Sequence, residues 1–153
     1  MMKTGLLTRK KALLIVFMSA ALLLVFIFLR FQKDNPHDLR TTEGRQMFLL
    51  ELGWEINPDS ESHKTVLIPK TLSGVMAEYN KMQLKQGFDL SKHPGESCEQ
   101  YIYTLTNYPA EDQVVLVTLY IQGRELIAAD IHSTAMNGFM HGIIRNEQKK
   151  AEG

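Results

Sequence analysis

Asp130 and His132 are the residues of this sequence whose types and spacing point most directly to chemistry. They stand two positions apart in the phrase Asp130-Ile131-His132-Ser133, and side chains two apart on a strand point to the same face of a sheet. A carboxylate beside an imidazole can orient a general base or a metal ligand. The alternative is a hydrogen-bonded pair, on the surface or half-buried, with a purely structural role, and we favour this interpretation.

His141 and Tyr108 are the other two candidates. His141 lies in the phrase Gly138-Phe139-Met140-His141-Gly142, and together with Asp130 and His132 it would supply three metal ligands if this segment folded back over the sheet. The spacing matches no established metal motif, so a structural histidine beside a tight turn is the simpler interpretation. Tyr108 could contribute to an aromatic patch for a peptide or glycan, although tyrosines are also ordinary sheet residues. We therefore expect no catalytic residue, no metal and no cofactor.

Composition and motifs exclude several classes of protein. The sequence has no nucleophile elbow, zinc-protease motif, phosphate loop or dinucleotide fingerprint. Five of its 17 basic residues and none of its 17 acidic residues fall in the first 30 positions, so the remainder is net acidic. An acidic domain argues against a nucleic-acid partner. The single cysteine, Cys98, cannot form an intramolecular disulfide, and we expect it in the core.

Residues 12–29 are uniformly apolar apart from Ser19 and carry no charge. As a helix this run would be about 27 Å long, close to the thickness of a bilayer's hydrocarbon core. Basic residues precede the run without any acid, which predicts a cytoplasmic N-terminus and an outward-facing C-terminal domain. A cleaved signal peptide is the alternative, but the small residues lie in the middle of the run rather than at its end.

This interpretation divides the chain into five parts. We expect a cytoplasmic N-terminus at residues 1–11, a single transmembrane anchor at 12–30 and a linker at 31–41. An extracytoplasmic α+β domain should occupy residues 42–145, and a disordered tail residues 146–153. The membrane contact itself is assigned to residues 12–29.

Two stretches of the predicted domain have the spacing of amphipathic helices. The first follows the pair Thr41-Thr42, either of which can cap it, and stops at Gly53. The second ends at Gly87, and its apolar residues recur every three or four positions, which predicts one buried face. Those residues are Leu72, Val75, Met76, Tyr79 and Met82. We expect this face to pack on the sheet against Val117 and Leu119.

Five stretches rich in β-branched and aromatic residues predict strands. They are residues 54–57, 64–68, 98–106, 113–122 and 125–132. Gly123-Arg124 fits a two-residue hairpin turn with glycine in the first position. The closing segment, residues 136–144, has helical spacing despite two glycines. The order of helix, two strands, helix and three strands predicts an α+β fold, with helices packed on one face of an antiparallel sheet.

Several phrases occur across this domain in a fixed order. They are Gly53-Trp54-Glu55, Tyr79-Asn80 with residues 86–91, Tyr103 with Asn107-Tyr108-Pro109, and residues 138–142. Together they resemble a bacterial family of Firmicutes called domain of unknown function 4830, over about residues 42–144. The resemblance implies no activity, because the family has none assigned. It implies a cysteine near the position of His132, so no thiol chemistry carries over to this chain.

Two hypotheses of different classes follow from these observations. The first is a non-catalytic, membrane-anchored module that binds an envelope protein, a peptide or a glycan outside a bacterial cell. The second is a metal-assisted hydrolase that uses Asp130, His132 and His141. The apolar run, the small acidic domain and the missing catalytic motifs favour the first.

Overall fold

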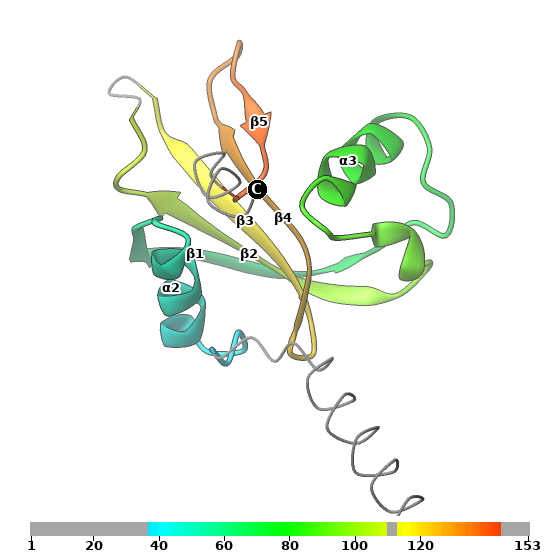
Figure 1. The fold of residues 1–153 in the computed structure, drawn as a ribbon, viewed down its shortest axis with the longest axis horizontal. Coiled ribbons are helices and arrows are strands. Elements are labelled where there is room, and N and C mark those ends of the chain that lie inside the picture. The colour runs from blue at the N-terminus through cyan, green and yellow to red at the C-terminus, as the bar shows by residue number, and fades with distance from the viewer. Residues whose placement is uncertain (1–36, 110–112, 145–153) are drawn as a thin grey trace, which may run out of the picture. The chain divides into compact units, whose positions relative to one another are not determined.

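A five-stranded antiparallel sheet organises the structure, and its strands lie side by side in chain order (Figure 1). The computed structural model describes residues 37–109 and 113–144. Its elements are α2 (Thr42–Glu51), β1 (Ile56–Leu67), α3 (Val75–Leu84), the 3-10 helix η1 (Leu90–Lys92), β2 (Ser97–Leu105), β3 (Val115–Gln122), β4 (Glu125–Ser133) and β5 (Met140–His141). Two α-helices packed with an antiparallel sheet confirm the predicted α+β class.

The predicted membrane run at residues 12–29 and the predicted tail at 146–153 lie outside the described residues. Within the ranges 37–109 and 113–144, no helix is both long and apolar enough to cross a bilayer. The anchor and its orientation therefore stay predictions from the sequence.

The first helix begins where its sequence indicates. The Thr41 side chain caps α2 by accepting a hydrogen bond from the Gly44 backbone N–H at 3.0 Å. A Cβ atom on Gly44 would lie 2.0 Å from the backbone oxygen of Asp38, so this close turn requires glycine. Leu39 is fully buried in the core. The folded unit therefore starts before Thr42, the predicted boundary of the domain.

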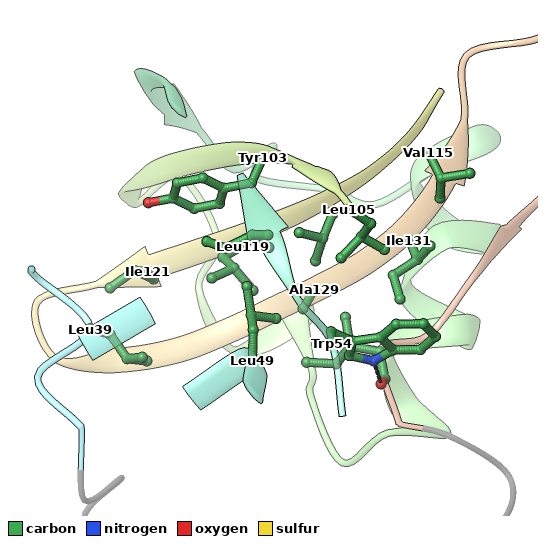
Figure 2. Packing of buried hydrophobic residues seen from close by; sticks show 13 residues of the cluster. Leu39, Leu49, Trp54, Tyr103, Leu105, Val115, Leu119, Ile121, Ala129 and Ile131 are labelled. Atoms are coloured by element: carbon green, nitrogen blue, oxygen red, sulfur yellow. Dashed lines mark hydrogen bonds between the residues drawn. The ribbon is translucent and has the colours of Figure 1, made fainter. Parts of the chain in front are cut away.

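The sheet is covered on both faces, not on one as predicted. Val117 and Leu119 of β3 lie in a core cluster with Leu49 of α2. Figure 2 shows Leu119 and Leu49 among the residues of this cluster. Met76 and Tyr79 of α3 pack in a second cluster, which contains Cys98 and Ala128. Adjacent strand residues point to opposite faces, and both faces of β3 are largely apolar. The two helices therefore pack on opposite sides of the sheet, because a sheet apolar on both faces needs a cover on each.

The predicted face of the second helix is only partly right. Leu72, Met76 and Tyr79 pack against the second cluster, but Val117 and Leu119, their expected neighbours, lie in the first. The helix α3 starts only at Val75, after Gly74 with φ 54°, and Val75 is 84% exposed. The buried residues of this helix are Asn80 and Gln83. Their amide groups bond backbone groups of neighbouring elements, which hydrophobic spacing cannot indicate.

Two further differences concern strands. The predicted strands at 54–57 and 64–68 both overlap one longer strand, β1, whose register against β2 shifts between Asn57 and Ser62. This irregularity accommodates the turn-like residues between them within a single edge strand. The hairpin at Gly123 is confirmed, with φ 62° and Gln122 paired to Glu125.

The predicted closing helix is absent, and the chain instead returns as the two-residue strand β5 beside β4. Gly138 allows the reversal, because a Cβ there would lie 2.8 Å from the Ala135 oxygen. Gly142 packs against the Gln86 side chain, whose Cδ would lie 2.4 Å from an added Cβ. The close packing that these glycines permit outweighs the helical spacing of the apolar residues between them.

Candidate functional site

Asp130 and His132 do form a pair, and a helix residue joins them. The two side chains share a face of β4, and Nδ1 of His132 lies 2.8 Å from one carboxylate oxygen of Asp130. The Tyr79 hydroxyl of α3 donates to the other oxygen at 2.7 Å. The side chain of Asp130 is only 3% exposed, whereas that of His132 is 25% exposed. The carboxylate is therefore buried between one donor from the helix and one from its own strand.

The electrostatics of this group favour a fixed carboxylate. Burial, and then the charge of Asp130, raise the pKa of Tyr79 far above its ordinary value, so its hydroxyl stays a donor. The hydrogen bond with Asp130 raises the pKa of His132, and partial burial works against this rise. Because the carboxylate accepts at Nδ1, only Nε2 of His132 remains open to a further contact. The arrangement can hold α3 to the sheet and can orient one imidazole.

His141 and Tyr108 meet on the other side of the sheet. His141 is paired with Ile131 in the β4–β5 register, and its neighbour Met140 with His132. By strand alternation, His141 and His132 therefore point to opposite faces. Nε2 of His141 lies 2.9 Å from the Tyr108 hydroxyl, and Nδ1 lies 2.7 Å from the Gly142 carbonyl oxygen. This geometry assigns the proton to Nδ1, so that Nε2 accepts from Tyr108.

Four rings stack around this contact. Tyr108 lies between Trp54 and Phe139, with ring centroids 5.7 Å and 5.1 Å away and interplanar angles of 13° and 19°. His141 stacks on Phe139 at 5.5 Å and 16°. Trp54 is 5% exposed, and its indole nitrogen donates to the backbone oxygen of Ile143 at 2.6 Å. Tyr108, Phe139 and His141 are half-buried, so their rings reach solvent, whereas the buried Trp54 supports the stack from the core side.

The geometry does not bring the predicted metal ligands together. Both nitrogens of His141 and both oxygens of Asp130 already have partners, and the two histidines point to opposite faces. Among the described residues, no group of three or more His, Cys, Asp or Glu side chains is arranged to hold a metal ion. The observed arrangement therefore gives no support to a metal-assisted hydrolase.

A buried arginine was missed from the sequence. Arg45 of α2 is 2% exposed and donates to the Tyr103 hydroxyl at 2.5 Å, to the Leu39 carbonyl at 2.8 Å and to Glu61 at 2.9 Å. Its guanidinium carbon lies 3.6 Å from the centroid of the Tyr101 ring. Burial favours a higher pKa for Glu61, but hydrogen bonds from Tyr103 and Arg45 outweigh it and lower this pKa. The cluster joins α2 to β1 and β2.

Two glutamines of the second helix region were also missed. Gln83 is fully buried, and its amide binds both backbone groups of Ala129, with distances of 3.0 Å to the N–H and 2.9 Å to the oxygen. Gln86 donates to the same oxygen at 3.0 Å and accepts from the Ile143 N–H at 2.7 Å. The Gln83 amide thus takes the place of a strand peptide at the edge of β4. The only signal in the sequence is an amide at a helical position close to the predicted core face.

Comparison with known proteins gives one match. A protein-family model described as "Domain of unknown function (DUF4830)" matches residues 48–131, which run from α2 to β4. The match confirms the family resemblance over this segment. Searches of curated proteins and of solved structures gave no match.

Proposed function

This chain belongs to the DUF4830 family, and we propose that it is a membrane-tethered, extracytoplasmic module that binds a peptide or protein segment through the rings of Tyr108, Phe139 and His141. The family description assigns no activity, so the proposal rests on the residues themselves. Residues 12–29 and their basic flank support the tether and its orientation.

The half-exposed ring stack is the observation that carries the binding role. Tyrosine and other aromatic side chains are enriched at protein interfaces, because they offer a large apolar area with little conformational freedom to lose. Here the rings are already ordered by Trp54 below and by the Tyr108–His141 hydrogen bond at the rim. A pre-organised surface loses less entropy when a partner binds. Pro109 and Asn137, both exposed, flank the rings in sequence.

Trp54 supplies the assay, because it is the single tryptophan of the chain and stacks on Tyr108. Its fluorescence would be titrated in the full-length protein with peptides rich in proline and aromatic residues, and separately with soluble envelope glycan fragments. We expect a saturable change with the peptides that is lost in Phe139→Ala. The matched control is Phe88→Ala, because Phe88 is also a half-buried phenylalanine packed on the same core cluster but outside the stack.

Three results would contradict the proposal. They are no saturable change with any probe, an equal change in Phe139→Ala and wild type, and a response to glycan fragments alone. The last result would keep the site but assign it to sugars.

A further inference from the structure

Among the described residues, no strand pairs with the outer edge of β5, and this edge lacks the features that protect the opposite edge of the sheet. The Ser133 N–H donates to the Phe139 oxygen at 3.0 Å, so the backbone groups of Phe139 and His141 face β4. In an antiparallel ladder the groups of the intervening residue, Met140, point away from β4. α3 caps the same edge only further along, at Ala129.

The composition of this edge differs from that of the rest of the domain. Residues 131–144 contain no Asp, Glu, Lys or Arg, in a chain that is 22% charged. Four of the nine large hydrophobic side chains that are exposed among the described residues gather here or directly beside it. They are Val114, Met136, Met140 and Ile144.

The other edge strand, β1, shows how this protein protects an edge. It carries Asp59, Glu61 and Lys64, one proline and a shift of register. Charges, proline and bulges on an edge strand all prevent pairing with a further strand. β5 has none of these features, and within the part of the chain that the structure describes only its small length limits pairing there.

We propose that β5 pairs with β5 of a second copy of this chain, antiparallel about a two-fold axis at Met140. The N–H and C=O of Met140 in each copy then bond those of the other copy, and one sheet runs through both. The exposed methionines of the two copies come together on the face that carries His132. The ring stacks, on the opposite face, stay open to a partner.

Charge and geometry favour a second copy as the occupant of this edge. Two net-acidic domains repel each other wherever their charged surfaces meet, and the uncharged stretch 131–144 is where they can approach without this cost. A two-fold contact also requires a self-complementary surface, which a short apolar strand provides. Two backbone hydrogen bonds and a few methionines make a weak contact in solution. Confinement in one membrane raises the effective concentration of the two copies and compensates for this weakness.

The inference rests on the membrane tether of the proposed function but not on its ring site. The test therefore uses the full-length chain in native membranes, in a Cys98→Ser background. Opposed residues in such a pair have Cα atoms about 5.5 Å apart, within the range of about 4.4–6.8 Å that a disulfide spans. Met140→Cys should give a disulfide-linked dimer on mild oxidation, several-fold more than Met47→Cys. Met47 is the matched control, because it is a methionine of α2 that is 49% exposed, against 53% for Met140.

A second variant tests the register of the pairing. Asn137→Cys is also exposed but lies three residues from the axis, so the two copies of this residue would be about 20 Å apart and should cross-link several-fold less than Met140→Cys. Equal yields from Met140→Cys and from either Met47→Cys or Asn137→Cys would overturn the proposal. So would a cross-link of Met140→Cys to a different protein. None of these results changes what the Trp54 titration should show. The β5 pairing and the peptide-binding site can therefore fail separately.

Discussion

Gln83→Met is the substitution that tests the packing of α3 most directly. Methionine keeps the length and much of the shape of the side chain but removes the amide that binds Ala129. The Ala129 oxygen keeps its hydrogen bond from Gln86, whereas the Ala129 N–H loses its acceptor. A buried, unsatisfied backbone group costs about 1–3 kcal/mol, so we expect the free energy of unfolding to fall by about 2 kcal/mol.

Urea unfolding of residues 35–153, which form a compact unit of their own, would measure this loss. Gln46→Met is the matched control, because Gln46 is an exposed glutamine of α2. It should change stability by no more than about 0.5 kcal/mol. If Gln83→Met also stayed within about 0.5 kcal/mol of wild type, the amide would not carry the docking of α3, and our account of this helix would be wrong.

Three further predictions concern the sites described above. The raised pKa of His132 means that the bond to Asp130 stabilises the fold fully below about pH 6.5, and that this contribution is lost as the pH rises through the raised value. Urea unfolding of wild type and His132→Gln from pH 5 to 9, in roughly one-unit steps, should show a difference in the free energy of unfolding that shrinks as the pH rises. A constant difference would refute this prediction. Arg45→Met should lower the free energy of unfolding by about 3 kcal/mol, because it leaves Glu61 and Tyr103 without their buried cation. A change in melting temperature no larger than that of Arg40→Met would contradict this. Tyr108→Ala should alter the emission of Trp54 whereas Tyr108→Phe, which keeps the ring, should not; identical spectra for the two variants would disprove the stacking.

Local signals in the sequence predict most of the sheet correctly. The strands β2, β3 and β4 follow β-branched and aromatic runs, and the hairpin at Gly123 follows from its glycine. The cap of α2 by Thr41 has the same local origin. The pairing of Asp130 with His132 was predictable too, because strand alternation acts over two residues.

Contacts between distant parts of the chain were not predictable in this way. Tyr108 and His141 meet across 33 positions, and the fold alone decides which faces they occupy. The buried face of α3 contains two amide side chains that bond backbone groups. Hydrophobic spacing assigns such polar residues to the solvent-exposed face of a helix. The segment around β5 has the spacing of a helix, but Gly138 and Gly142 fit close contacts that only the finished structure makes.

The labelling of one engineered cysteine tests the central claim, that this domain stands outside the membrane on an N-terminal anchor. Ser73→Cys places a thiol at an exposed position before α3, and the native Cys98 is buried and would be replaced by serine. A membrane-impermeant thiol reagent added to intact cells should label this protein, and the labelled chain should sediment with the membranes. Labelling that occurs only after lysis, or a labelled chain in the soluble fraction, would contradict the account.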